Sequence, residues 1–342
     1  MQFKPRRQTS LEGATVLVTG AAGFIGSHTC EQLITAGHRV IGLDDLSTGH
    51  LSNLWNVIDH EHFTFVEGDV LKARLLNRLC KEHQPHAIIH LAGLVSVVVA
   101  QANPEKNFRL NLQATQTVAS AAKRNGVRRV VFASSAAVYG DCSEPLIHEN
   151  CPTRPIGLYG GAKLASEELL LAHSVSYGME VVCLRYFNVY GDRQDPKNPY
   201  SGVISIFSDR FARRQPVTVF GDGEQTRDFI SVRDVARANV LAATNASVES
   251  GSRNVCTGKS RSINELIGIF AAIYPDAPPP RFEDSRVGEI IRSCGNGGYA
   301  SMILGFEPFI EMEDGLCDLV AIQRFEAIQR LEVMNAPVAE AA

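Results

Sequence analysis

The chain has 342 residues, of which 45% are hydrophobic and 20% charged, and its net charge is −4 at pH 7. A chain of this length and composition can bury a large apolar core, which excludes a disordered, collagen-like or small disulfide-rich protein. The weakly acidic charge offers no basic field to nucleic acid, and no apolar run reaches the length of a transmembrane helix. We therefore expect neither a nucleic acid nor a membrane as a partner.

Eight cysteines are scattered along the chain, and none has the spacing of a metal site. Several lie within apolar runs, where a thiol behaves as a small hydrophobic group. The N-terminal segment is polar and basic and lacks the apolar stretch of a signal peptide. We expect reduced cysteines, no bound metal and a cytoplasmic location.

Short apolar runs alternate with helical patterns through the first half of the chain. They predict strands at 14–19, 39–43, 63–66, 87–91, 130–133 and 179–184, and helices at 24–36, 71–83, 104–125 and 159–177. This alternation indicates an α/β fold with a doubly wound parallel sheet of the Rossmann type. The carboxyl ends of the strands then meet at one ligand-binding edge.

The regular alternation of strand and helix patterns ends after residue 188. A segment rich in Gly, Pro, Asp and Asn predicts a long loop at 191–202. Later patterns predict a short strand at 217–220 and helices at 203–213, 232–243, 263–273 and 313–330. The alanine-rich tail at 336–342 is expected to fray.

The turn after the first strand reads GAAGFIG at residues 20–26. A strand precedes it and a helix follows, which is the context of a dinucleotide-binding loop. Among Gly20, Gly23 and Gly26, one glycine permits the tight turn, one lets the backbone approach a pyrophosphate, and the last lets helix and strand pack closely. The spacing differs from G-x-G-x-x-G, and a glycine turn that serves packing alone is the alternative interpretation.

Acidic side chains follow the next two strands. Asp44 ends the second strand, 18 residues beyond Gly26. A carboxylate there accepts hydrogen bonds from the ribose hydroxyls and repels a 2′-phosphate, which favours NAD over NADP, although a solvated turn acid is the alternative. Asp69 follows the third strand and could either face the adenine or cap the next helix.

Tyr159 and Lys163 are four residues apart, so they share one face of the predicted helix. A free tyrosine titrates near pH 10, and a base that acts near pH 7 needs a pKa about three units lower, or roughly 4 kcal/mol of phenolate stabilisation. An adjacent ammonium and a cationic nicotinamide would supply it jointly. A hydroxyl at the end of the fifth strand, Ser135 rather than Ser134, would reach a reacting oxygen beside Tyr159.

With these motifs in this order, the chain resembles the extended short-chain dehydrogenases/reductases, and among them the UDP-glucose and UDP-N-acetylglucosamine 4-epimerases. The resemblance covers about residues 14–330. The matching segments are VTGAAGFIGSH (18–28), LDDLSTGH (43–50), EGDV (67–70), HLAGLVSV (90–97), SSAAVYGD (134–141), YGGAK (159–163), LRYFNVYG (184–191) and DGEQTRDFISVRDVA (222–236).

The resemblance implies an NAD-binding Rossmann domain at 1–187 and 229–256, and a smaller α/β domain that binds the sugar nucleotide at 188–228 and 257–342. The implied cofactor contacts are Gly20, Gly23, Phe24, Ile25, Gly26, Asp44, Asp69, Val70, Leu91, Ala92 and Lys163. The implied substrate contacts are Ser96, Ser135, Tyr159, Asn188, Phe220, Arg227, Arg286 and Ser293. Among these, Asn188, Arg227 and Arg286 would bind the diphosphate, and Phe220 would lie near the uracil.

The resemblance also implies the reaction, which is C4 epimerisation of a UDP-hexose. Tyr159 would take the proton of the sugar 4-hydroxyl while the C4 hydride passes to bound NAD⁺. The resulting 4-keto sugar would turn over before the hydride returns to its opposite face. Related proteins usually form homodimers through the helices that match 104–125 and 159–177, so a homodimer is expected.

Two stretches bear on the choice within the family. Related 4,6-dehydratases carry an acidic pair after the fifth strand, and UDP-glucuronate decarboxylases usually carry Glu, whereas this chain has Ser135-Ala136-Ala137. In the 4-epimerases that the chain resembles, a bulky Tyr at the position aligned with Ser293 excludes an N-acetyl group. The resemblance therefore implies that a chain with the small Ser293 converts UDP-GlcNAc to UDP-GalNAc, by analogy for surface polysaccharide. If the alignment slips by one residue, Arg292 or Cys294 takes this place. Val98-Val99 replace a Pro-Arg step that is frequent in enzymes for acetylated sugars.

Three alternatives remain open at this point. A strict UDP-glucose/UDP-galactose 4-epimerase would share the reaction but not the substrate. A sugar-nucleotide dehydratase or reductase would release a new compound instead of an epimer. A non-catalytic NAD-binding protein on the same fold would often have lost Tyr159 or Lys163, and both residues are present.

Overall fold

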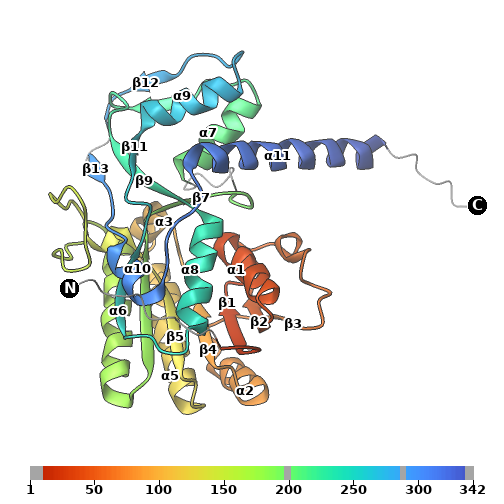
Figure 1. The fold of residues 1–342 in the computed structure, drawn as a ribbon, viewed down its shortest axis with the longest axis vertical. Coiled ribbons are helices and arrows are strands. Elements are labelled where there is room, and N and C mark those ends of the chain that lie inside the picture. Colours follow the sequence, from red (N-terminus) through yellow and green to blue (C-terminus); the bar gives the residue numbers. More distant parts are fainter. Residues whose placement is uncertain (1–10, 196–201, 286–289, 336–342) are drawn as a thin grey trace, which may run out of the picture.

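The structure is a computed structural model, and it describes residues 11–195, 202–285 and 290–335. Seven parallel strands form the main sheet in the order β10-β6-β5-β4-β1-β2-β3 (Figure 1). They are β1 (Thr15–Thr19), β2 (Arg39–Asp44), β3 (Phe63–Glu67), β4 (Ala87–His90), β5 (Arg129–Ser135), β6 (Glu180–Tyr186) and β10 (Gly251–Val255). The predicted doubly wound parallel sheet is confirmed.

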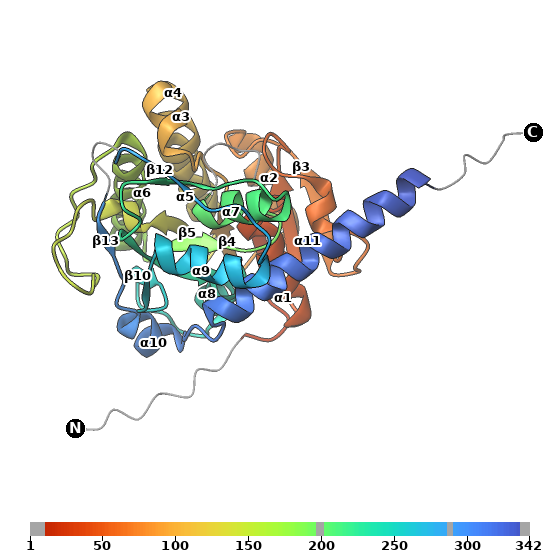
Figure 2. The same cartoon turned by 90° about the horizontal axis from the view of Figure 1, so that it is seen from above.

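Helices cover both faces of this sheet (Figures 1 and 2). One face carries α1 (Phe24–Thr35), α8 (Val232–Thr244) and α10 (Gly298–Leu304), and the other carries α2 (Ala73–His83), α5 (Ala114–Arg124) and α6 (Leu158–Tyr177). The apolar runs serve both layers, because successive side chains of a strand point to opposite faces. On β1, Val16 and Val18 join the core on the α1 side, and Leu17 joins the core on the α2 side.

The chain reverses its direction of progress across the sheet at β1. The strands β2 and β3 lie on one side of β1, whereas β4, β5 and β6 follow on the other. In open α/β sheets, ligands bind at the carboxyl edge where the strand order reverses. The loops after β1 and β4 lie at this position, so the fold itself places the glycine loop beside the segment that begins at Leu91.

Two smaller sheets build the second unit. One contains β7 (Asn188–Tyr190), β9 (Thr226–Ser231), β11 (Ser260–Ser262) and β13 (Arg292–Ser293), and the other pairs β8 (Thr218–Phe220) with β12 (Arg281–Glu283). They pack with α7 (Val203–Ala212), α9 (Ile263–Ile273) and the start of α11 (Met312–Asn335) around a separate apolar core. The rest of α11 extends away from the body of the molecule (Figures 1 and 2).

One segment of the chain bears on where the two units meet. The sequence prediction places residues 257–342 in the second unit, yet Ala300 and Leu304 of α10 and the following Phe306 pack in the core beneath α8. We therefore propose that the segment 298–306 belongs with the first unit, although segments of the second unit precede and follow it in the chain.

The long helix expected at 104–125 is interrupted. The structure has α4 (Pro104–Asn107), a π-helical segment η2 (Phe108–Gln113) and then α5, and it adds the short helix α3 (Val97–Ala102) before them. Ser96 begins α3 by accepting a hydrogen bond from the Val99 amide at 3.0 Å. A π-helical turn widens the backbone ring and has no sequence pattern of its own, which explains why the prediction missed it.

Short 3₁₀ helices lie at η1 (Leu51–Leu54) and η3 (Ala136–Val138). The final helix was predicted at 313–330 and extends over Met312–Asn335. The tail that we expected to fray lies outside the described residues. Within the described part of the chain, no helix combines the length and the apolar character that crossing a bilayer requires.

Candidate active site

The glycine loop packs tightly at the edge of the sheet. Gly20 has φ +72°, and a Cβ there would lie 2.7 Å from the Ala92 amide nitrogen. A Cβ on Gly26 would overlap the Gly20 carbonyl oxygen, so this glycine lets α1 lie against the end of β1. Gly23 is the N-cap of α1 and provides no side chain to cap it. The first amides of α1 are thus presented to an anion, as a pyrophosphate site requires.

Asp44 links this loop to the end of β2. Its carboxylate accepts hydrogen bonds from the Ala22 amide at 2.9 Å and the Leu46 amide at 2.8 Å. Burial raises the pKa of Asp44, and these two amides act in the opposite direction. The carboxylate is held rigidly rather than solvated in a turn, which matches the role expected of a ribose acceptor.

Several predicted cofactor contacts share one cavity. It is lined by Gly20, Asp44, Asp69, Val70, Ala92 and neighbouring residues. Asp69 accepts a hydrogen bond from the Leu71 amide at 2.8 Å, whereas the N-cap of α2 is Lys72, so Asp69 does not cap that helix. Phe24 and Ile25 form the first turn of α1, and Leu91 follows β4 at the same edge.

The residues at this edge fit a bound dinucleotide. A Cβ at Gly20 or Gly26 would fill the space beside the loop, an uncapped helix start faces the loop, and three carboxylates line the adjoining cavity. The glycines, the amides of α1 and Asp44 are the groups that would hold the pyrophosphate and the ribose.

Ser135, Tyr159 and Lys163 come together at the end of β5 and the start of α6. The Tyr159 hydroxyl is hydrogen-bonded to Ser135. The Lys163 ammonium lies 5.9 Å from the centre of the Tyr159 ring and donates a hydrogen bond to the Ala133 carbonyl at 2.8 Å. The Ser135 hydroxyl also accepts a hydrogen bond from the Ala137 amide at 3.1 Å. A proton acceptor, a hydroxyl and a cation thus face the same space.

The electrostatics of this cluster differ from the sequence-based argument. Burial raises the pKa of Tyr159, and the bond to Ser135 acts only partly against it. Burial also lowers the pKa of Lys163, to about 8. In the protein alone, therefore, the ammonium does not make Tyr159 acidic. The cationic nicotinamide ring would have to supply most of the phenolate stabilisation.

Three of the predicted substrate contacts lie together on the second unit. In the register of β13 and β9, Ser293 lies opposite Arg227. Asn188 on the neighbouring strand β7 donates a hydrogen bond to the Asp228 carbonyl at 3.0 Å, and Arg227 donates one to the Thr226 carbonyl at 2.9 Å. Asn188, Arg227 and Ser293 therefore lie on one small sheet.

The other predicted substrate contacts lie apart from this sheet. Phe220 lies at the end of β8, in the separate two-stranded sheet. Ser96 is buried, and its hydroxyl is engaged as the N-cap of α3. Arg286 lies outside the described residues, so its predicted role is not addressed by the structure.

The buried carboxylate of Asp228 holds the strands of this sheet together. It accepts hydrogen bonds from the Thr257 amide at 2.8 Å, the Gly258 amide at 2.9 Å and the Gly295 amide at 3.2 Å. Burial raises the pKa of Asp228, and these donors act against that change. The segment that carries Ser293 is thereby fixed beside Arg227.

Sequence reasoning missed two polar residues behind the cofactor edge. His90 at the end of β4 is buried and bonded to the Thr19 hydroxyl at 2.8 Å, and its pKa is lowered to about 3 by burial and by Lys163. Asn111, in the π-helical segment, accepts a hydrogen bond from the Leu94 amide and donates one to the Leu94 carbonyl, at 3.1 and 3.0 Å. Asn111 could have been identified as a site residue only from the interruption of the helix, and that interruption has no sequence signal.

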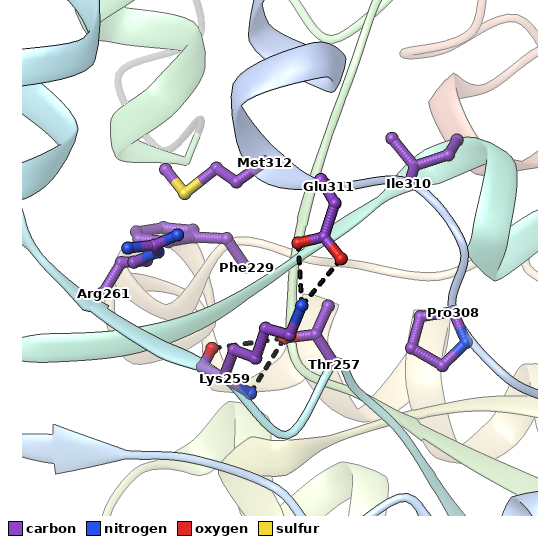
Figure 3. Close-up of a pocket in the computed structure, with 8 residues that line it drawn as sticks. All are labelled: Phe229, Thr257, Lys259, Arg261, Pro308, Ile310, Glu311 and Met312. Atoms are coloured by element: carbon purple, nitrogen blue, oxygen red, sulfur yellow. Dashed lines mark hydrogen bonds and ion pairs between the residues drawn. The ribbon is translucent and has the colours of Figure 1, made fainter.

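A separate pocket lies on the second unit and is lined in part by β9, the strand that carries Arg227 (Figure 3). Ion pairs from Lys259 to Glu311 at 2.7 Å and from Arg261 to Glu313 at 2.8 Å fasten the turn after β10 and strand β11 to the start of α11. None of the predicted site residues that the structure describes lines this pocket. Its lining residues are Phe229, Thr257, Lys259, Arg261, Pro308, Ile310, Glu311 and Met312.

Known proteins match the chain over most of its length. Residues 16–256 match the model of the NAD dependent epimerase/dehydratase family. A UDP-glucose 4-epimerase of Mycolicibacterium smegmatis is 37% identical over 310 residues, which is 90% of this chain and 98% of the relative.

Solved structures match equally well. A UDP-N-acetylglucosamine 4-epimerase from Methanobrevibacter ruminantium, in complex with UDP-N-acetylmuramic acid, superposes with a TM-score of 0.87 at 34% identity and covers 92% of this chain and 100% of that one. A UDP-glucose 4-epimerase from Thermotoga maritima, with UDP-glucose, gives 0.85 at 33% identity over 92% and 99% of the two chains. This chain therefore belongs to the NAD-dependent epimerase/dehydratase family of extended short-chain dehydrogenases/reductases, whose cofactor is NAD.

Proposed function

We propose that this protein is a UDP-hexose 4-epimerase that converts UDP-GlcNAc to UDP-GalNAc and also accepts UDP-glucose. The observation that carries the proposal is the cluster of Ser135, Tyr159 and Lys163 at the same sheet edge as the glycine loop. The activities named for the relatives agree with it, since both UDP-glucose and UDP-N-acetylglucosamine 4-epimerases are among them.

Each residue of the proposed catalytic cluster has a separate role in the reaction. NAD, when bound, supplies the acceptor and donor of the hydride at C4 of the sugar. Tyr159 holds the proton of the sugar 4-oxygen and returns it later, so it serves as base and then as acid. Ser135 donates a hydrogen bond to the same oxygen. Lys163, fixed by the Ala133 carbonyl, places its charge beside Tyr159.

In this proposal, residues of the second unit bind the nucleotide. Guanidinium groups bind phosphate oxygens through paired hydrogen bonds, which suits Arg227 to a diphosphate. Asn188 lies on the adjacent strand, and Phe220 offers an aromatic surface for the uracil. The sugar must turn over between the two half-reactions, so the site must leave free space around the sugar. The nucleotide stays bound in one place and needs no such space.

The register of β13 supports Ser293 as the residue that limits this room. Ser293 is the strand partner of Arg227, and partners in register point to the same face of a sheet. Arg292 and Cys294 point to the other face, and the Cys294 thiol lies 3.9 Å from the Asp228 carboxylate on that side. A serine leaves about the volume of an aromatic ring free, which would accommodate an N-acetyl group.

The alternatives have less support. The end of β5 carries no acidic side chain to eliminate water, which disfavours a dehydratase. Lys163 and Tyr159 are both in place, which disfavours a non-catalytic role. The strict UDP-glucose 4-epimerase remains the second candidate, and the names of several relatives favour it.

A homodimer is part of the proposal. On the α2 side of the sheet, α5 lies against α6, and α3 also contacts α6. The outer surfaces of α3 and α6 expose apolar side chains, among them Val97, Val98, Val175 and Tyr177. A second copy would cover this apolar surface.

Proton NMR of the purified protein tests the function, with UDP-GlcNAc and UDP-glucose supplied separately and no NAD added. We expect the anomeric signal of the galacto epimer to appear from both substrates, because NAD stays bound through each turnover. Conversion of UDP-glucose alone would support the strict epimerase. Conversion of neither, even with added NAD, would reject the proposal.

A further inference from the structure

A buried carboxylate lies directly behind the proposed catalytic residues. Glu167 is on α6, four residues after Lys163, and its exposed fraction is 0%. It accepts hydrogen bonds from Nε and Nη2 of Arg185, at 3.0 and 2.6 Å. It also accepts bonds from the hydroxyls of Ser252, at 3.0 Å, and Ser134. All of these donors come from strands of the main sheet.

Stability alone gives little reason to keep this charge in the core. Removing a carboxylate and a guanidinium from water carries a desolvation penalty that their attraction often only balances, and apolar residues of similar volume can do as well. Arg185 is also committed here, since it donates to the Tyr139 hydroxyl at 3.0 Å and the Glu149 carbonyl at 3.3 Å. The Glu167–Arg185 pair is therefore neither a surface ion pair nor a group that is available to bind the substrate.

The partners of Glu167 lie next to the catalytic groups in the chain. Ser134 immediately precedes Ser135 at the end of β5, and Lys163 precedes Glu167 by one helical turn. The carboxylate thus connects the strand that carries Ser135 to the helix that carries Tyr159 and Lys163. Arg185 on β6 and Ser252 on β10 connect it to two further strands.

Resting on the proposed function, we propose that Glu167 is a positioning residue of this active site, which fixes α6 against β5 so that Ser135, Tyr159 and Lys163 keep their mutual geometry. Groups that hold catalytic side chains from behind affect rates because small displacements of reacting groups are costly. Glu167 touches no substrate or cofactor and acts only through its neighbours.

Charge provides a second link between Glu167 and the site. Glu167 is the charged group that raises the pKa of Lys163 against the effect of burial. Among the described residues, the other titratable groups near these two side chains include Tyr159 on α6, the neutral His90 on β4, and Arg185 and Cys183 on β6. Loss of the Glu167 charge would therefore release the Lys163 proton at a lower pH.

The experiment compares E167Q with E167D and with E168Q in the full-length protein. Glu168 is the next residue on α6 and is exposed, so E168Q makes the same chemical change outside the network. The first readout is the pH at which Lys163 becomes half-reactive toward acetic anhydride, followed by peptide mass spectrometry. The second is the split of kcat and KM for the epimerisation of UDP-glucose.

We expect the labelling midpoint of Lys163 to lie near pH 8 in the wild type and in E168Q, and to fall by about one pH unit in E167Q. In E167Q, kcat should fall about tenfold with KM unchanged. E167D should restore the midpoint, because it restores the charge, and should recover part of kcat. A role in fold stability alone would lower the melting temperature of E167Q and leave its kcat unchanged.

Equal midpoints in E167Q and the wild type would overturn the inference, as would a rise in KM that accounts for the whole loss. If E167Q does not fold, the double variant E167Q/R185M removes both buried charges; its Lys163 midpoint should fall by less than that of E167Q, because loss of the Arg185 cation partly offsets loss of the carboxylate. If the midpoint falls in E167Q as expected but the wild type epimerises no UDP-hexose, the proposed function is contradicted and the coupling of Glu167 to Lys163 is still supported.

Discussion

Replacement of Tyr159 by phenylalanine is expected to lower kcat for UDP-glucose epimerisation by about 10³-fold, within the range that general acid–base groups contribute. The ring and its packing remain, and only the hydroxyl that is bonded to Ser135 is lost. No other group in the cluster can take its place. Lys163 is turned to the Ala133 carbonyl, and the Ser135 hydroxyl is too weak a base.

Steady-state rates by the NMR assay measure this effect, and two controls separate it from damage to the fold. The NAD content of Y159F and its melting temperature should match those of the wild type, because the lost hydroxyl belongs to a half-buried side chain. A variant that retains more than a tenth of the wild-type kcat would show that another group moves the proton.

The second large effect concerns the choice of sugar. Replacement of Ser293 by tyrosine is expected to lower kcat/KM for UDP-GlcNAc by about 100-fold and to leave that for UDP-glucose within about threefold. An aromatic ring beside Arg227 would occupy the space proposed for the N-acetyl group, whereas a sugar with a hydroxyl at C2 does not need it.

Competition between the two substrates in one NMR sample gives the ratio of their kcat/KM values directly. The matched control is Arg292→Tyr, which introduces the same ring one position earlier, where the side chain is exposed and points to the other face. Equal losses for both sugars in S293Y, or a larger change in R292Y, would contradict the place assigned to Ser293.

The main sheet and the cluster that we propose as catalytic could be predicted from the sequence because each depends on local signals. Six of the seven strands are apolar runs bounded by turns, and the GAAGFIG loop and the Tyr159–Lys163 pair keep fixed spacings along the chain. The seventh strand, Gly251–Val255, was missed because its residues are largely polar and it becomes a strand only by pairing with β6.

The parts that escaped prediction depend on tertiary contacts. Strands such as β7 and β13 have two or three residues, and only their pairing with β9 defines them. The roles of Glu167 and Asp228 are equally invisible in the sequence, because their partners come from distant segments. The acidity of Tyr159 was argued from its spacing to Lys163, but burial, which spacing does not show, reverses the sign in the protein alone.

The central claim is that the hydride removed from C4 of the sugar returns to the same carbon within one active site. The most direct test supplies UDP-glucose carrying deuterium at C4 of the sugar in ordinary water, without added NAD, and examines the UDP-galactose by NMR and mass spectrometry. The proposed chemistry predicts complete retention of deuterium at C4 of the product. Loss of the label to solvent, or an epimer inverted at another carbon, would contradict it.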